Sequence, residues 1–313
     1  HASLAPSEMC IRDRKYIIGV DGGGTKTEAV AYDFQGNIIV TSVKGFANLL
    51  NNREKALNNI VDSIREIIDV LKEDELVDLY LGIAGSEVGD NAKIIKDTIK
   101  NELKTDCVLM NDAEIALKAM LRGNDGILTI AGTGSIAFGV KNNSSVRCGG
   151  WGNLLGDEGS GYKISIDAIK RMIFEEENSL PKSELTTRIM KRLGAKSIGE
   201  VVTFVYSSTK DEIASLAEVV SILGEEGNKI AEEILVNEGV DLAKTVINVY
   251  RKLKFESCSI ALVGGVIRKA KILRKSFEKY LRENIVIEYI VDDEISPTIG
   301  AYYINKAKRE SNV

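Results

Sequence analysis

The order of predicted strands and helices runs twice through this chain, and this duplication limits the possible fold more than any other feature. In the first half, three strand-like segments precede an alternation of helices and strands, in the order β-β-β-α-β-α-β-α. Alternating or β-branched apolar residues mark the strands, whereas a 3.6-residue period marks the helices. The strands are expected at 16–21, 25–33, 37–43, 79–85 and 107–111, and the helices at about 52–72, 90–103 and 112–123.

The second half repeats this order with one long interruption, a helical region of about 182–254. The remaining strands are expected at 126–132, 133–140, 145–150, 259–265 and 285–290, and the remaining helices from near Glu158, at about 267–282 and at about 298–308. The sequence therefore predicts an α/β protein with two duplicated domains, a ligand-binding cleft between them and a helical insertion in the second.

The chain of 313 residues, 44% of them hydrophobic, is long enough for two domains with separate cores. We expect residues 1–15 to form an N-terminal extension or a cloning remnant. Residues 16–121 are then the N-terminal domain, and residues 122–313 are the C-terminal domain. The last helix is an element that can pack back on the N-terminal domain.

The charge balance excludes some classes of partner. Acidic residues number 46 and basic residues 41, the formal net charge is −5, and no long Lys/Arg block is present. A nucleic-acid partner is therefore not expected. No apolar run approaches the roughly 18–20 residues of a membrane span, so we expect no membrane partner.

Histidine and cysteine usage limits the chemistry further. The one histidine, His1, lies in the N-terminal segment, so a histidine base or ligand is nearly excluded. The cysteines, at 10, 107, 148 and 258, are widely spaced and form no C-x-x-C pair. This spacing predicts neither a zinc site nor a disulfide framework, and it fits a reducing cytoplasm.

The segment DGGGTKT (21–27) joins the first two predicted strands. A hairpin needs only one or two glycines, whereas three in succession expose several backbone N–H groups with no side chain in front of them. Such a nest binds an anion such as phosphate, although a glycine-rich turn without a ligand stays possible. Asp21, at the strand end, would repel a phosphate unless a cation lies between them, which indicates Mg²⁺.

A second loop of this kind, AGTGSIA (131–137), starts the second half. It matches the G-x-G-x-x-A pattern superficially, but a dinucleotide-binding loop opens a helix and this loop opens a strand. Two phosphate loops, one in each half, suit a nucleoside triphosphate. A third glycine turn, ALVGGV (261–266), permits either close packing of a helix on a strand or close approach to an adenosine.

Five motifs, in this order and spacing, resemble those of the N-acetylglucosamine kinases: VDGGGTKT, NDAEIA, AGTGS, GGWGNLLGDEGSGY and LVGGV. These kinases belong to the BadF/BadG/BcrA/BcrD ATPase group of the sugar kinase, actin and heat-shock ATPase superfamily. The resemblance extends from about Tyr16 to Tyr302, and the longest motif is the most specific. It implies two duplicated ribonuclease-H-like (actin-like ATPase) domains, each a mixed five-stranded sheet with flanking helices.

The resemblance implies that Asp112, in NDAE, is the catalytic carboxylate that accepts the proton of the sugar's 6-hydroxyl. Phosphoryl transfer depends on alignment and charge neutralisation, with one group to orient the nucleophile, so a carboxylate suits this role. The alternative is a helix cap made by Asn111 or Asp112, and both roles can hold together.

The resemblance also assigns residues to the two ligands and to the metal ion. The ATP-binding residues would be Gly23, Gly24, Thr25, Lys26, Thr27, Gly132, Thr133, Gly134, Gly264 and Gly265. The substrate-binding residues would be Asn48, Asp112, Ser135, Gly150, Trp151, Gly152 and Asp157, and Asp21 would serve the metal. Structural alternatives are a turn for Asn48, a core anchor for Trp151 and a helix cap for Asp157.

These features predict an ATP- and Mg²⁺-dependent amino-sugar kinase in the cytoplasm. The substrate implied is N-acetylglucosamine, with N-acetylmuramic acid as in related bacterial kinases, in the salvage of cell-wall sugars. A homodimer is expected from the relatives alone, and the helical insertion would form a wall of the adenosine site. A glucosamine or glucose kinase and a non-catalytic ATP-binding regulator of the same fold stay open. The closely spaced cysteines of related iron–sulfur activators are missing, which argues against that role.

Overall fold

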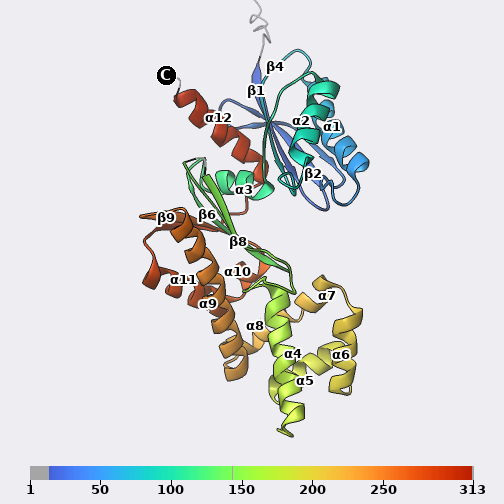
Figure 1. Ribbon diagram of the computed structural model, residues 1–313, viewed down its shortest axis with the longest axis vertical. Helices are drawn as coiled ribbons and strands as arrows, with labels where there is room; N and C mark the ends of the chain where they lie inside the picture. Colours follow the sequence, from blue (N-terminus) through green and yellow to red (C-terminus); the bar gives the residue numbers. More distant parts are fainter. Residues whose placement is uncertain (1–13, 143, 312–313) are drawn as a thin grey trace, which may run out of the picture. The chain divides into compact units, whose positions relative to one another are not determined.

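The computed structural model describes residues 14–142 and 144–311. Residues 1–13 of the expected extension lie outside the described residues. The chain forms two compact units, the first made of the residues up to 124 together with those from 294 onward, and the second of residues 125–293 (Figure 1). The first unit thus includes the C-terminal segment that the sequence-based division had counted with the second domain.

The sheet of the first unit has the strand order β3-β2-β1-β4-β5. β1 pairs antiparallel with β2 and β2 with β3, whereas β4 pairs parallel with β1 and with β5. The strands are β1 (Lys15–Gly22), β2 (Thr27–Asp33), β3 (Ile38–Lys44), β4 (Glu75–Ile83) and β5 (Val108–Met110). β1 lies in the middle of the sheet, which explains why its residues 16–20 are all buried.

Three helices cross between these strands: α1 (Arg53–Val70), α2 (Asn91–Leu103) and α3 (Asp112–Met120). α1 begins after Asn52, whose side chain accepts a hydrogen bond from the N–H of Lys55. Its buried isoleucines, at 60, 64 and 67, recur at helical spacing and belong to the core beneath the sheet.

The C-terminal segment of the first unit consists of the 3₁₀ turn η1 (Pro297–Ile299) and helix α12 (Gly300–Glu310). α12 contacts α3, β1 and β4. The Tyr32 and Thr298 hydroxyls are hydrogen-bonded at 2.7 Å, and a Cβ on Gly19 would lie 2.1 Å from the Thr298 carbonyl oxygen. This close packing on β1 is the physical reason why the segment belongs to the first unit.

The sheet of the second unit repeats the arrangement, with the order β10-β9-β6-β7-β8 and the same pattern of parallel and antiparallel pairs. Its strands are β6 (Gly126–Ala131), β7 (Ser135–Lys141), β8 (Ser144–Gly149), β9 (Cys258–Val263) and β10 (Ile287–Val291). The predicted α/β class with two duplicated five-stranded mixed sheets is therefore confirmed.

The helices of the second unit are α4 (Gly161–Glu177), α5 (Glu184–Leu193), α6 (Ile198–Ser207), α7 (Lys210–Ala214), α8 (Ala217–Glu225), α9 (Lys229–Lys252), α10 (Gly265–Lys269) and α11 (Lys271–Asn284). α9 packs against β7, β8 and α11 (Figure 1). The long predicted helical region is thus a series of five helices, α5 to α9.

Two sequence-based boundaries need correction. The helix expected from near Glu158 begins at Gly161, because the Ser160 side chain caps it by accepting from the N–H of Lys163. The single helix expected at 267–282 is two helices, α10 and α11, because Ala270 leaves the helical conformation (ψ 83°). Among the described residues, no helix is long and apolar enough to cross a membrane.

Candidate active site

The glycine loop of the first unit, between β1 and β2, presents unused backbone donors to open space. The N–H groups of residues 24–26 donate to no described residue. Behind the loop, the carbonyl groups of residues 22–24 accept hydrogen bonds from Ala84, from Ala47 and Asn48, and from the Asn51 side chain. A Cβ on Gly23 or Gly24 would meet nothing within 4 Å. The loop is thus held from behind while its donors stay available for an anion.

The side chains at the end of this loop differ in availability. Lys26 is largely exposed, and its ammonium lies 3.6 Å from a carboxylate oxygen of Glu28. Thr27, predicted to bind ATP, is fully buried, and its hydroxyl donates to the carbonyl of Gly45 at 2.7 Å. Its side chain therefore supports the loop from inside the unit and is not exposed to a ligand.

The glycine loop of the second unit, between β6 and β7, is built in the same way. The carbonyl groups of Gly132 and Thr133 accept hydrogen bonds from the first N–H groups of α4, those of Gly161 and Tyr162. The N–H groups of Thr133 and Gly134 donate to no other described residue. Both units thus contain a glycine loop whose carbonyl groups are held by hydrogen bonds while some of its N–H groups lack a partner among the described residues.

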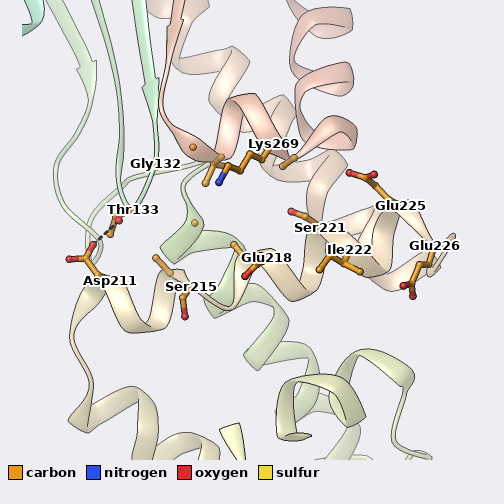
Figure 2. Close-up of a pocket in the computed structure, with 16 residues that line it drawn as sticks. Gly132, Thr133, Asp211, Ser215, Glu218, Ser221, Ile222, Glu225, Glu226 and Lys269 are labelled. Carbon is orange, nitrogen blue, oxygen red and sulfur yellow. Dashed lines mark hydrogen bonds between the residues drawn. The ribbon is translucent and has the colours of Figure 1, made fainter. Parts of the chain in front are cut away.

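Helix α7 of the insertion brings two charged side chains against this second loop. The hydroxyl of Thr133 donates to the Asp211 carboxylate at 2.7 Å (Figure 2). The Lys210 ammonium donates to the Asp157 carboxylate at 2.7 Å, and Asp157 is 3% exposed. The segment that precedes α4 is held against β7, because the buried hydroxyl of Ser135, the first residue of β7, donates to the Glu158 carbonyl at 2.6 Å.

A cavity of about 860 Å³ lies beside this loop, within the second unit (Figure 2). It is lined by the loop, by α7 and α8, and by the start of α10, including residues Gly132, Thr133, Asp211, Glu218, Ser221, Gly265 and Lys269. This volume falls within the ~300–1,000 Å³ range of small-molecule sites. Residues of the helical insertion form one wall of this cavity.

The two glycines of the third turn have different roles. Gly264 adopts φ +113°, and a Cβ there would lie 2.3 Å from the carbonyl oxygen of Ala131. This glycine therefore permits close packing of the turn on β6 and does not line the cavity. Gly265 does line the cavity, and a Cβ there would meet nothing within 4 Å.

Two carboxylates of the first unit have pKa values above the ordinary range. Burial, together with the nearby charges of Asp112 and Glu28, raises the pKa of Asp21 to about 6, although the charge of Lys26 acts against them. Burial is also the main cause that raises the pKa of Asp112, and the charge of Glu87 adds to it. Raised pKa values from burial and like charges are typical of functional carboxylates.

The loop after β4 contributes a residue that the sequence analysis missed. The side-chain amide of Asn111 donates to both carboxylate oxygens of Glu87 at 2.9 Å. The amide oxygen of Asn111 accepts from the N–H of Ala113 at 2.8 Å and so caps α3. Glu87 thereby fixes the residue that precedes Asp112. The available signal was its position just after a buried strand.

The predicted sugar-binding residues lie in both units. In the first, Asn48 accepts from the N–H of Leu50 at 2.9 Å, and its side chain faces Gly85. In the second, Gly150 and Gly152 have φ of +67° and +88°, conformations that favour glycine. Trp151 is 64% exposed and lies under the Arg147 guanidinium, 4.6 Å from the ring centroid, so it is not a core anchor.

The acidic side chains form no preassembled metal cage. Among the described residues, no group of three or more histidine, cysteine or acidic side chains could hold an ion. The partly buried Asp21 offers a single carboxylate whose repulsion from Asp112 and Glu28 a cation would relieve. This donor set fits Mg²⁺, which usually keeps several waters and takes one or two carboxylates plus phosphate oxygens.

Comparison with known proteins places this arrangement in a family. Residues 18–304 match the BadF/BadG/BcrA/BcrD ATPase family. The chain belongs to this family. The predicted resemblance is thereby confirmed over nearly the whole chain.

Individual relatives agree with this membership. The chain is 32% identical over 303 residues to the N-acetylmuramic acid/N-acetylglucosamine kinase of Clostridium acetobutylicum, covering 94% of this chain and 99% of the relative. It is 28% identical over 309 residues to the N-acetyl-D-glucosamine kinase of Dictyostelium discoideum, covering 92% and 97%.

A solved structure supports the fold. The ROK family glucokinase from Streptomyces griseus, in complex with glucose and AMPPNP, matches with a TM-score of 0.54 at 17% identity, covering 94% of this chain and 99% of that one. The predicted actin-like ATPase fold is therefore confirmed.

Proposed function

We propose that this protein is an ATP-dependent amino-sugar kinase that phosphorylates the 6-hydroxyl of N-acetylglucosamine and of N-acetylmuramic acid. The observation that carries this proposal is the pair of glycine loops, at residues 24–26 and 133–134, whose N–H groups have no partner among the described residues. Membership of an ATPase family and two relatives named as kinases of these sugars support it.

ATP is proposed to bind with its adenosine in the cavity of the second unit and its phosphates on the glycine loops. Gly265 leaves room at the cavity wall, and Gly23, Gly24, Gly132 and Gly134 keep the loop backbones accessible. Thr25, Lys26 and Thr133 add side-chain donors. Gly264 and Thr27 support the site without contacting ATP, because Gly264 packs on the backbone of Ala131 and the Thr27 hydroxyl is buried against the Gly45 carbonyl.

Asp112 is proposed to accept the proton of the sugar hydroxyl. As the bond from O6 to the γ-phosphorus forms, the O6–H bond breaks toward the Asp112 carboxylate and the bond from phosphorus to ADP breaks. Its raised pKa brings its basicity closer to the working pH than an ordinary aspartate has. Asn111, held by Glu87, fixes the start of α3 that carries Asp112.

Asp21 is proposed to hold Mg²⁺, through water or directly. When bound, the ion neutralises charge on the phosphate oxygens during transfer. Asp21 itself contributes a carboxylate at the end of β1, next to the donors of the first loop.

The sugar is proposed to contact Asn48, Asp112, Ser135, Gly150, Trp151, Gly152 and Asp157. Of these, Trp151 offers an exposed ring face, which suits the apolar face of a sugar. The buried Asp157 carboxylate keeps acceptor capacity beside its bond to Lys210, which suits recognition of a sugar hydroxyl. The Ser135 hydroxyl is engaged by Glu158, so Ser135 shapes the pocket through that bond.

The biological setting is proposed to be the recycling of peptidoglycan sugars by a cytoplasmic homodimer. Support comes from the name of the bacterial relative, which acts on both cell-wall sugars. Small-molecule sugar and ATP are the proposed partners. The acidic net charge of −5 fits the absence of a nucleic-acid or membrane partner.

The test is ADP release from Mg-ATP over a panel of N-acetylglucosamine, N-acetylmuramic acid, glucosamine, glucose, N-acetylmannosamine and no sugar. The proposal expects sugar-stimulated release with the first two. Release with glucosamine or glucose alone would keep the mechanism and correct the substrate. No stimulation by any sugar would refute the kinase function and favour an ATP-binding regulator.

A further inference from the structure

The Lys210 ammonium lies between Asp157, which is proposed to bind the sugar, and Gly134 of the second glycine loop, which is proposed to bind phosphate. Its Nζ donates to Oδ2 of Asp157, a proposed sugar-binding residue, at 2.7 Å. The same Nζ lies 2.9 Å from the position that a Cβ on Gly134 would occupy, and Oδ2 of Asp157 lies 2.8 Å from it. The ion pair therefore rests directly on the backbone of the second glycine loop, in the space that the missing side chain leaves.

The two members of this ion pair are not equally enclosed. The Asp157 side chain is 4% exposed, whereas the Lys210 side chain is 37% exposed. An ammonium carries three N–H donors, and Asp157 is the one described acceptor that contacts it. Two of its three donors therefore have no acceptor among the described residues.

The neighbouring residue, Asp211, places a carboxylate against the side-chain donor of the same loop. Asp211 follows Lys210 on α7, and its carboxylate accepts the Thr133 hydroxyl at 2.7 Å (Figure 2). A carboxylate oxygen here stands in for another charged acceptor oxygen, such as one of a phosphate. Beside the loop's own hydroxyl and two backbone N–H groups thus lie the Lys210 ammonium and the carboxylates of Asp157 and Asp211.

We propose that Lys210 is a further catalytic residue, whose ammonium contacts the terminal phosphate of ATP on the loop of residues 132–134. This inference rests on the proposed kinase function. Asp157 holds the ammonium against Gly134, and the two remaining donors neutralise charge on the phosphoryl oxygens while the group passes to the sugar. Lys210 forms no covalent bond and gives up no proton. The helical insertion therefore supplies a cation to the reaction as well as a wall to the cavity.

A different role for Lys210 would be to compensate the buried Asp157 charge alone. In that case its removal would disturb the sugar site and the stability of the unit, but not the recognition of the third phosphate. The two roles therefore differ in how nucleotides with two and three phosphates respond to loss of the ammonium.

The experiment compares the wild-type protein with Lys210→Met and Lys210→Arg. Calorimetric titration with Mg-ADP and with the non-hydrolysable Mg-AMPPNP gives the affinity ratio of the two nucleotides. Steady-state kinetics on N-acetylglucosamine give kcat and KM. Lys229→Met is the matched control, because the Lys229 ammonium also contacts a carboxylate oxygen at 2.7 Å but belongs to an exposed pair on α9.

We expect Lys210→Met to weaken AMPPNP binding about tenfold and to leave ADP binding within about twofold, since only the nucleotide with a third phosphate loses a charged hydrogen bond. The kcat should fall about 100-fold, as for loss of one preorganised donor to a transition state, while Lys210→Arg keeps a substantial part of both. Lys229→Met should match the wild type. An unchanged AMPPNP-to-ADP ratio in Lys210→Met would overturn the inference.

A double variant and the behaviour of the wild type keep the test decisive. If Lys210→Met unfolds because Asp157 is left unpaired, the ratio is measured in the double variant Asp157→Asn/Lys210→Met against Asp157→Asn alone. The same shift in the ratio is expected there, and its absence would overturn the inference. A wild type without sugar-stimulated turnover would refute the proposed function, whereas the nucleotide ratio would still decide whether Lys210 contacts the third phosphate.

Discussion

The hydroxyl of Thr133 donates a hydrogen bond of 2.7 Å to the carboxylate of Asp211. A negative charge from α7 therefore engages the side-chain donor of the second glycine loop. A phosphate that binds this loop has to displace Asp211 from Thr133 or share the donor with it. The Asp211 carboxylate therefore competes with the phosphate of the proposed nucleotide for the Thr133 hydroxyl.

Asp211→Ala is expected to tighten ATP binding about two- to tenfold, because the competing carboxylate and its repulsion of phosphate are removed. Titration calorimetry with AMPPNP measures the change. Asp241→Ala is the control, since Asp241 forms an exposed pair with Lys244 on α9. Weaker binding by Asp211→Ala alone would show that Asp211 assists the nucleotide instead.

Asp21→Asn is expected to raise stability and lower activity. The pKa of Asp21 in the folded protein, about 6, is above the value of a free aspartate, so the folded state holds the extra proton between about pH 4 and 6. Stability therefore falls as pH rises through that window, and the ionised carboxylate costs folding free energy above it. At pH 7.5 the free energy of unfolding of the asparagine variant should exceed that of the wild type by about 1–2 kcal/mol.

The same variant should lose most of its Mg²⁺-dependent turnover, and wild-type activity should fall as pH drops below about 6, where Asp21 takes up a proton. Urea unfolding and a pH–rate profile provide both readouts. An asparagine variant that is less stable and fully active would contradict the account of Asp21.

Glu238 is a buried carboxyl on α9 that supports the motif GGWGNLLGDEGSGY from behind. One oxygen accepts the N–H of Gly159 at 2.6 Å. Burial, with help from the hydrogen-bonded Asp167, raises the pKa of Glu238 to about 8, although the Gly159 N–H and the charge of Lys163 act against both. Glu238 is therefore protonated at neutral pH in the folded state and ionised in the unfolded state.

The folded protein should thus lose about 2–4 kcal/mol of stability as pH rises from 5 to 8 through this group. Glu238→Gln keeps an acceptor for Gly159 and a donor for Asp167, so we expect a flatter dependence and higher stability at pH 8. Thermal unfolding at several pH values measures it. An equally steep dependence in the variant would mean that Glu238 is ionised in the folded state.

The adjacent glycines of the third turn provide a matched pair. Gly264→Ala should cost about 2–4 kcal/mol, because it combines a φ of +113° with a Cβ placed 2.3 Å from the Ala131 carbonyl oxygen. Gly265→Ala should cost little stability, since that Cβ meets nothing, but it should raise the KM for ATP by narrowing the cavity. Equal stability losses in the two variants would contradict the division of roles.

Much of the fold was predictable because its signals are local. The apolar run of β1 follows from its burial in the middle of the sheet, and the spacing of isoleucines in α1 follows from the one face that this helix buries. The glycine loops were predictable because strand hairpins do not need three glycines. The membership of residues 294–311 in the first unit depends on contacts distant in sequence, such as Tyr32 with Thr298, and periodicity does not encode them.

The candidate site was predictable in its backbone and less so in its side chains. The sequence pattern treats Thr25 and Thr27 alike, yet Thr25 lies in the loop, whereas Thr27 begins β2 and turns its hydroxyl inward to the carbonyl of Gly45. Glu87, Lys210 and Asp211 escaped the sequence analysis because they reach the site from a loop and an inserted helix. Their contacts follow from tertiary packing alone.

The central claim is that Asp112 accepts the proton of a sugar hydroxyl during phosphoryl transfer, and Asp112→Asn tests it most directly. The variant keeps the side-chain volume and the acceptor for the N–H of Ala113, which Asp112 contacts at 2.9 Å. We measure sugar-stimulated ADP release together with AMPPNP affinity. The account predicts that turnover falls at least about 100-fold while affinity stays within about threefold. Turnover near the wild-type value, with the asparagine confirmed in the protein, would contradict it.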